Sequence, residues 1–245
     1  MSSRLGVNID HVATLREARG EDYPCLKRAT KVCLENGADQ ITIHLREDRR
    51  HIQDNDVFDV RKIVTEYNKL LNLEISTSDS VIDTCLEAKP DWVCLVPEKR
   101  EERTTEGGLN LLSPVVFEKI ESTINLLKDK LDVKISLFVE ANTEVLGKVS
   151  TLNIDAVEIH TGDFALAYNK GLELSPFYKQ FENSKKKMNA LSLGHHAGHG
   201  LTLEMLDSLV SHCEFEEYNI GHWIIAESIF SGLGHVVESI RKKIK

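Results

Sequence analysis

Histidines gather at the ends of short apolar runs along this chain. Seven of the ten histidines lie at or just after such an end: His11, His44, His160, His195, His196, His199 and His222. An even scatter would rarely give this pattern, so a common site is the simplest interpretation. Histidine gives or takes a proton near neutral pH. The pattern predicts acid/base chemistry, although any single ring can instead satisfy a buried backbone carbonyl.

Two carboxylates lie inside otherwise apolar segments. Glu74 is part of NLEIS, and Glu158 is part of VEIHTG. An unpaired charge is costly to bury, so each carboxylate needs a partner or a function. A structural ion pair is the plain alternative. We favour a functional role because both residues are close to run ends that carry histidines.

Glycines and cations in three connections predict anion sites. AGHGLT (197–202) and NIGH (219–222) follow consecutive apolar runs. Their glycines let backbone N–H groups approach phosphate oxygens, and a following helix N-terminus favours negative charge. HLREDRRH (44–51) can hold a second anionic group, and Arg19 can serve similarly. The alternative for such charges is a solvated run.

A long polar connection spans residues 98–109 and contains Gly107 and Gly108. Long loops beside active sites often act as lids, so we predict a lid here. A plain solvated loop is the alternative.

Short apolar runs alternate with longer amphipathic segments through the whole chain. The apolar runs predict eight strands at 5–10, 40–45, 71–76, 92–97, 134–140, 156–161, 189–194 and 217–221. The amphipathic segments predict eight helices at 25–36, 57–67, 81–88, 115–131, 143–151, 175–187, 203–212 and 224–245. This alternation is typical of βα units around a parallel sheet.

No linker-like or low-complexity tract divides these units, so we predict one α/β domain over 1–245, a closed (β/α)₈ TIM barrel. An open doubly wound sheet is the alternative. Its dinucleotide-binding version usually has a glycine-rich turn after the first strand, where this chain has NIDH (8–11). Barrel enzymes build their sites beyond the carboxyl ends of the strands, which is where the polar residues described above would meet.

Composition narrows the class of partner. The formal net charge of −9 disfavours a general nucleic-acid binder. Five scattered cysteines without a CxxC pair indicate reduced thiols. No stretch approaches the roughly 20 apolar residues of a membrane span, and the start of the chain has no long apolar region. We expect a cytoplasmic protein with small-molecule partners, no nucleic acid and no membrane.

Seven segments between residues 6 and 222 resemble, in order, the signature segments of the pyridoxine 5′-phosphate synthase family: GVNIDHVATLREARG, ITIHLREDRRHI, NLEIS, CLVPEKREERTTEGGL, VEIHTG, AGHGLT and NIGH. The resemblance implies a (β/α)₈ barrel that forms homo-oligomers, commonly octamers. It implies condensation of 1-deoxy-D-xylulose 5-phosphate with 3-amino-2-oxopropyl phosphate, with release of pyridoxine 5′-phosphate, phosphate and water. It implies no metal and no organic cofactor.

The resemblance also implies roles for individual residues. The aminoketone phosphate would be held by Asn8, Arg19, Gly200, Gly221 and His222. The deoxyxylulose phosphate would contact Asp10, His11, Arg46, His51 and Thr104. The catalytic residues would be His44 and Glu74 as proton acceptors, His199 as a proton donor, and Glu158 as a stabiliser of charged intermediates. His195 and His196 receive no catalytic role, and segment 163–173 receives no role.

Three rival functions remain. A metal-dependent hydrolase also gathers histidines, but it usually has a His-x-His pair on an early strand, whereas the first predicted strand offers NIDH. A Schiff-base aldolase needs a desolvated lysine, which the ends of the sixth and seventh predicted strands lack. A barrel that only binds a phosphorylated metabolite would differ from an enzyme by its lack of turnover.

Overall fold

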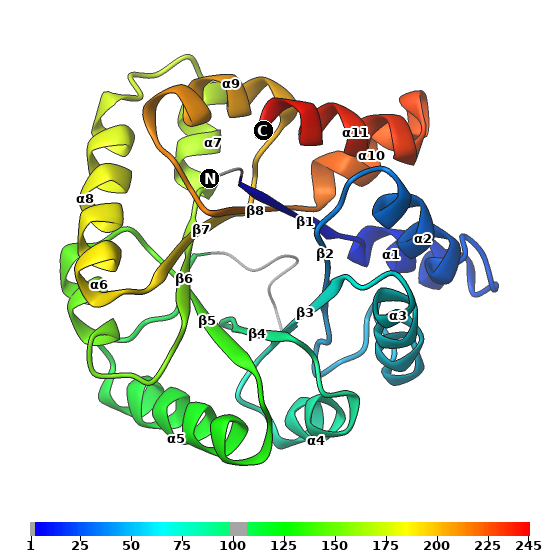
Figure 1. Cartoon of the computed structure of the whole chain (residues 1–245), viewed down its shortest axis with the longest axis horizontal. Coiled ribbons are helices and arrows are strands. Elements are labelled where there is room, and N and C mark those ends of the chain that lie inside the picture. Colours follow the sequence, from blue (N-terminus) through cyan, green and yellow to red (C-terminus); the bar gives the residue numbers. More distant parts are fainter. Residues whose placement is uncertain (1–2, 99–106) are drawn as a thin grey trace.

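Eight parallel strands close into a barrel in the computed structural model, which describes residues 3–98 and 107–245. Each strand pairs with the next along the chain, and β8 pairs with β1. Figure 1 looks into the barrel, with the helices arranged around it. The predicted (β/α)₈ fold is confirmed.

The strands are β1 (Arg4–Asn8), β2 (Gln40–His44), β3 (Leu70–Ile75), β4 (Trp92–Leu95), β5 (Lys134–Val139), β6 (Ala156–His160), β7 (Gly194–Gly198) and β8 (Glu217–Ile220). The helices are α1 (Asp10–Arg19), α2 (Leu26–Glu35), α3 (Asp54–Glu66), α4 (Asp79–Ala88), α5 (Pro114–Lys130), α6 (Thr143–Val149), α7 (Gly162–Asn169), α8 (Ser175–Leu191), α9 (Leu203–His212), α10 (His222–Ser231) and α11 (Leu233–Lys243). Among the described helices, none is both long and apolar enough to cross a membrane.

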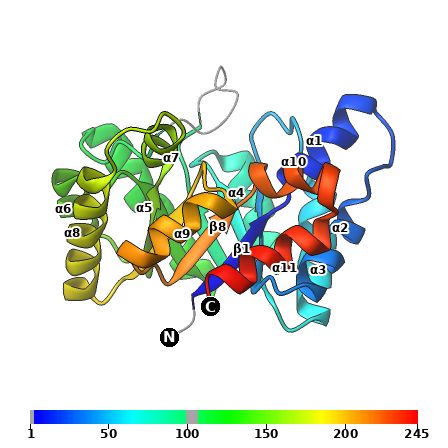
Figure 2. The ribbon, with the colours of Figure 1, turned by 90° about the horizontal axis from the view of Figure 1, so that it is seen from above.

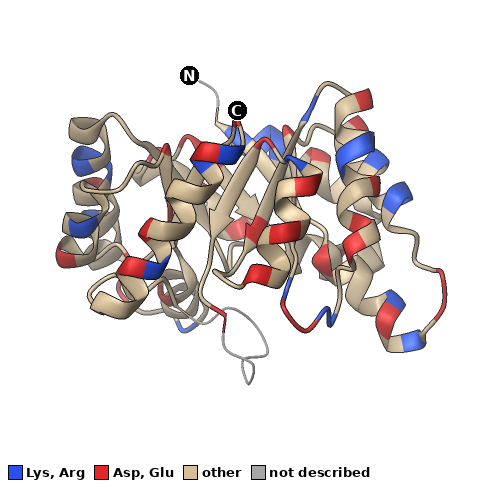
Figure 3. Cartoon of the chain, turned by 90° about the horizontal axis from the view of Figure 1, so that it is seen from below, with Lys and Arg blue, Asp and Glu red and all other residues tan. Residues whose placement is uncertain are grey.

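The strands are buried on both faces, but the two faces differ in chemistry. Side chains alternate along a strand. On β2, Ile41 and Ile43 belong to the main apolar core. Gln40 and Thr42 alternate with them and form hydrogen bonds with Asn219 of β8. The interior face of β2 is therefore polar, although Val96 and Phe138 also line the cavity. Charged residues of both signs alternate over the surrounding helices (Figure 3).

The seventh strand differs from its prediction. Residues 189–191 end α8, and the strand is Gly194–Gly198. Its sequence, GHHAG, has no β-branched residue, because close contacts with neighbouring side chains decide which residues fit in this strand. A Cβ at Gly198 would lie 1.9 Å from Oε1 of Glu158. His195 stacks on Phe215, at 4.4 Å between ring centroids, and lies inside this strand and not after it. Tertiary contacts thus override the local propensity on which the prediction depended.

Helix boundaries differ in three other places. The first strand ends at Asn8, and Asp10 begins α1, which was not predicted; α7 was also not predicted. The predicted helix 224–245 is two helices separated by Gly232, whose φ of 82° lies in the left-handed region that favours glycine. In Figure 2, α1, α7 and α10 lie toward the end of the barrel opposite the chain termini, where the strands end.

Candidate active site

A cavity of about 490 Å³ opens at the carboxyl ends of the strands. Its size suits a small-molecule site. Twelve of the fourteen predicted site residues line it: Asn8, Asp10, His11, His44, Arg46, His51, Glu74, Glu158, His199, Gly200, Gly221 and His222. The structure brings these residues together from most of the barrel strands.

Two predicted site residues are not among the cavity-lining residues. Arg19 is the exposed last residue of α1. Thr104 lies outside the described residues, as do residues 99–106 of the predicted lid.

Asp10 fixes the ends of β1 and β2. Its Oδ2 accepts a hydrogen bond from Nδ2 of Asn8, and its backbone N donates to Oδ1 of Asn8, both at 2.9 Å. Oδ1 of Asp10 accepts from the backbone N of His44, also at 2.9 Å. Asp10 is buried at the start of α1, where the helix dipole favours a negative charge. The positions of Asn8 and His44 therefore depend on one carboxylate.

His44 lies between two carboxylates. Its Nδ1 is 3.9 Å from Oε2 of Glu74, and its Nε2 is 3.7 Å from Oε2 of Glu98. Glu98 also lies 3.4 Å from Nε of Arg46. Burial alone would raise the pKa of Glu98, but His44 and Arg46 together lower it. The structure thus supplies His44 with an acidic partner on each side, which suits a ring that exchanges protons.

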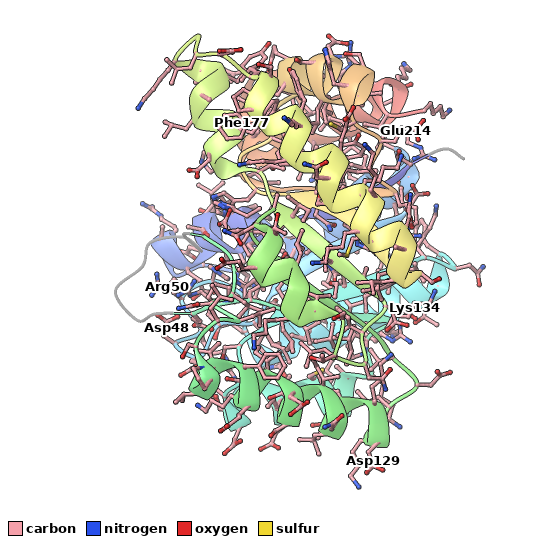
Figure 4. All side chains as sticks on the ribbon, turned by 90° about the vertical axis from the view of Figure 1, so that its left-hand side faces the viewer. Asp48, Arg50, Asp129, Lys134, Phe177 and Glu214 are labelled. Atoms are coloured by element: carbon pink, nitrogen blue, oxygen red, sulfur yellow. The ribbon has the colours of Figure 1, made fainter. Side chains whose placement is uncertain are left out.

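The arginines that follow β2 are held by carboxylates. Arg49 contacts Asp54 at 2.9 Å, and Arg50 contacts Asp48 at 2.6 Å. Figure 4 shows Asp48 and Arg50 at one end of the barrel, with Lys134 and Glu214 at the other. Arg46 and Arg50 line the cavity, so part of the predicted cationic run faces the site.

Glu158 is buried at the floor of the cavity in a polar network. Oε2 of Glu158 accepts from Nδ2 of Asn219 at 2.7 Å, and the same amide lies 3.0 Å from Oε1 of Glu217. Burial, and then the charge of Glu217, raises the pKa of Glu158 to about 8. Burial, with the charges of Glu158 and Asp10, also raises the pKa of Glu74 well above its usual value. The surroundings of Glu158 and Glu74 therefore favour the protonated form of these two residues.

The connection after β7 holds His199 in an unusual backbone conformation. His199 has a φ of 79°, which is uncommon for a residue other than glycine. The buried Thr161 hydroxyl lies 2.7 Å from the His199 carbonyl and 2.8 Å from that of Gly198, so it can donate to either. Burial, and then the charge of His160, lowers the pKa of His199 to about 4. The ring is therefore neutral near pH 7.

The glycine-rich connections lie beside the N-terminus of α10. Gly200 has a φ of 77°, and Gly221 precedes His222, the first residue of α10. A Cβ at Gly221 would lie 2.8 Å from Cβ of Asn8, so only glycine fits there without a shift. The rings of His222 and His11 meet edge-on, with centroids 4.9 Å apart. Backbone N–H groups, a helix N-terminus and an imidazole at this corner suit a phosphate.

Some residues around the site were not assigned a role from the sequence. Asn219 lines the cavity, and Glu98 contacts His44. Glu98 follows the predicted strand 92–97, and Asn219 lies near the end of the predicted strand 217–221; the signal in the sequence was the other polar residues around each of them. Glu140 was missed because nothing in its local sequence shows that His160, on the next strand, contacts it at 2.7 Å.

One group of described residues has the chemistry of a metal site. Ligand atoms of Asp10, His44 and Glu74 lie within 4.8 Å of one another. Burial raises the pKa of Glu74, which favours its neutral form over the anionic form that binds cations. This group is where the metal-dependent alternative can be tested.

The closed barrel and the histidines and carboxylates at its C-terminal face define an acid/base enzyme of the (β/α)₈ class. The chain belongs to the family described as pyridoxal phosphate biosynthesis protein PdxJ, whose family model matches residues 5–245.

Relatives match nearly the whole chain. It is 42% identical over 241 residues to pyridoxine 5′-phosphate synthase of Sulfurihydrogenibium sp. (strain YO3AOP1), covering 98% of this chain and 97% of the relative. It is 43% identical over 245 residues to pyridoxine 5′-phosphate synthase of Wolbachia pipientis subsp. Culex pipiens (strain wPip), covering 99% of this chain and 97% of the relative.

Solved structures share the fold at low sequence identity. A tryptophan synthase structure from M. tuberculosis matches with a TM-score of 0.65 at 8% identity, covering 100% of this chain and 93% of that chain. Thiamine phosphate pyrophosphorylase from Pyrococcus furiosus matches with a TM-score of 0.59 at 15% identity, covering 98% of this chain and 95% of that chain. These likenesses concern the barrel alone.

Proposed function

We propose that this chain is a pyridoxine 5′-phosphate synthase that condenses 3-amino-2-oxopropyl phosphate with 1-deoxy-D-xylulose 5-phosphate and releases phosphate and water. The observation that carries the proposal is one cavity lined by two groups suited to phosphate and by several acid/base groups. The first group, Gly200, Gly221 and His222, follows β7 and β8; the second, Arg46 and His51, follows β2. Two phosphorylated substrates need two such phosphate-binding groups.

Proton transfers would be divided among the catalytic residues. Imine formation, loss of water, elimination of phosphate and ring closure each move a proton, and no single residue is in the required state throughout. His44 and Glu74 are proposed as acceptors. Because burial raises the pKa of Glu74, this residue would accept a proton only in its ionised form, after its own proton has passed to another group. His44 lines the cavity, so its ring can meet a bound substrate.

His199 is proposed as the proton donor. Its lowered pKa keeps the ring neutral near pH 7. A nearby anion raises the pKa of an imidazole, so arrival of a phosphate would load His199 with a proton. The donor would then be active only when substrate is bound.

Glu158 is proposed to stabilise cationic intermediates. With a pKa of about 8, it holds a proton near neutral pH. A cationic imine close to it would favour the ionised form, because an opposite charge lowers the pKa of a carboxyl group. Glu158 would thus release a proton as positive charge develops in the substrate.

We also propose that Arg19 and Thr104 bind substrate, as the family resemblance implies, that residues 1–245 form one domain, and that the protein is cytoplasmic and a homo-octamer. Light scattering of the purified protein at several concentrations tests the octamer. A mass of eight chains supports it, and a monomer at all concentrations contradicts it.

Steady-state turnover tests the proposed function. The protein is mixed with both phosphorylated substrates, and pyridoxine 5′-phosphate is followed by chromatography. His44→Ala and His199→Ala should each lower kcat by about 10²-fold or more, the usual contribution of a general acid or base. His235→Ala, on an exposed turn of α11, is the matched control and should keep wild-type turnover. Binding of both substrates without product would instead indicate a binding protein.

A further inference from the structure

His160 and Glu140 form a second His–carboxylate pair, directly beside the cavity. Nδ1 of His160 lies 2.7 Å from Oε1 of Glu140. Because a carboxylate accepts hydrogen bonds, this contact places a proton on Nδ1 and directs Nε2 away from Glu140. His160 is one of the histidines near the end of a predicted strand, and it has no role in the proposed function.

The far edge of the His160 ring faces His199. The two ring centroids are 5.1 Å apart. A Cβ added at Gly162 would lie 2.4 Å from Nε2 of His160 and 3.2 Å from Cδ2 of His199, so both ring edges pack over this glycine. Phe138, which lines the cavity, lies against both rings, with centroids 5.3 Å from His160 and 6.3 Å from His199. The ring of His199 is thus confined on one side by His160 and Phe138.

Glu140 also contacts Gly108, at the described end of the predicted lid. Its Oε1 accepts a hydrogen bond from the backbone N of Gly108 at 2.9 Å. A Cβ at Gly108 would lie 2.6 Å from backbone atoms of Val139 and Glu140, so this close approach requires glycine. One carboxylate oxygen therefore joins the chain at Gly108 to the imidazole that contacts His199.

We infer that His160 and Glu140 are positioning residues that hold the ring of His199 and tune its affinity for a proton. The inference rests on the proposed role of His199 as proton donor. His160 would fix the ring by contact, and Glu140 would fix His160. Neither is needed for substrate binding in this scheme, since neither lines the cavity.

The charges of the pair should act on His199 in opposite directions. The charge of His160 lowers the pKa of His199, whereas the charge of Glu140 raises it; His222 also lowers it, and burial has the largest effect of all. Removing the charge of Glu140 should therefore lower the pKa of His199 further, and replacing His160 by a neutral residue should raise it. A purely structural pair would not produce two shifts of opposite sign.

The test uses Glu140→Gln and His160→Asn in the full chain. Asparagine can still donate to Glu140, so His160→Asn keeps the fold-supporting bond and removes the ring. Each variant should lower kcat about tenfold while KM changes by less than about twofold, because an interaction felt mainly in the transition state is lost. Glu144→Gln and His235→Gln, both exposed, are matched controls and should leave kcat and KM unchanged.

The titration of His199 is followed by NMR in the unliganded protein, with His199→Ala used to assign its signal. Opposite shifts in the two variants support the inference. Unchanged kcat with an unchanged titration in both would overturn it, and so would an increase in KM alone. If wild type gives no product, the proposed function fails, but the titration still decides whether the pair acts on His199.

Discussion

Replacing Gly162 with alanine tests how closely the rings of His160 and His199 must be held. The new Cβ would lie 2.4 Å from Nε2 of His160, whereas real Cβ atoms essentially never come closer than 3.0 Å. The ring must therefore move by more than half an ångström. That movement either stretches the 2.7 Å contact with Glu140 or displaces His199. A misplacement of about 1 Å can cost about 10²-fold in rate, so we expect kcat to fall by about tenfold.

The stability of this variant should change much less than its activity. Gly162 begins α7, where alanine is favoured over glycine by up to about 1 kcal/mol. Overpacking costs about 1–3 kcal/mol, so the net loss in the free energy of unfolding should stay below about 2 kcal/mol. The matched control is Gly147→Ala in α6, whose added Cβ would meet only Nζ of Lys187, at 3.6 Å. It should keep wild-type kcat and gain about 0.5–1 kcal/mol.

The assay combines steady-state kinetics with urea unfolding of both glycine variants. Wild-type kcat in Gly162→Ala would refute the reasoning, because it would show that His199 tolerates displacement of its neighbour. Equal losses of kcat in both variants would also refute it, since Gly147 is remote from the cavity.

Three further perturbations have defined outcomes. Burial and the charge of Glu217 raise the pKa of Glu158 to about 8, so the folded state keeps a proton that the unfolded chain loses above about pH 4.5. As pH rises from about 4.5 to 8, the free energy of unfolding of wild type should therefore fall relative to that of Glu158→Gln by about 1.4 kcal/mol per pH unit. If urea titrations gave parallel curves of unfolding free energy against pH for the two proteins, they would contradict this. Thr161→Val loses the buried hydroxyl, so its free energy of unfolding in urea should fall by about 1–3 kcal/mol and its kcat should also fall. Thr161→Ser, which keeps a hydroxyl, should restore both. Arg16→Met, which breaks two 2.7 Å bonds to Asp56, should cost about 2 kcal/mol in thermal or urea unfolding, and a loss below about 0.5 kcal/mol would show that the pair is not stabilising.

The barrel could be predicted from the sequence because short segments rich in Val, Ile and Leu alternate with longer amphipathic segments. The segment 40–45 is one of them, and it becomes β2 with Ile41 and Ile43 in the core. The strand Gly194–Gly198 could not be predicted, since its glycines and histidines are required by contacts with residues distant in the sequence. Gly198 packs against Glu158, and His195 stacks on Phe215. Tertiary packing, which a local pattern does not contain, decides such a strand.

The site was predictable to the extent that a barrel brings strand ends together. This geometry alone explains why His44, Glu74 and His199 share a cavity. It does not give the side-chain contacts that tune them. That Glu140 holds His160 depends on the pairing of β5 with β6 and on rotamers, neither of which is encoded by spacing along the chain.

The central claim is that one cavity converts two phosphorylated substrates into pyridoxine 5′-phosphate. A single-turnover experiment tests it most directly, with enzyme in excess over both substrates and with ring product and inorganic phosphate measured in the same quenched samples. Wild-type protein should form one phosphate for each pyridoxine 5′-phosphate, and His199→Ala should form neither on the same timescale. Phosphate released without the ring product, or no product from folded wild-type protein, would contradict it.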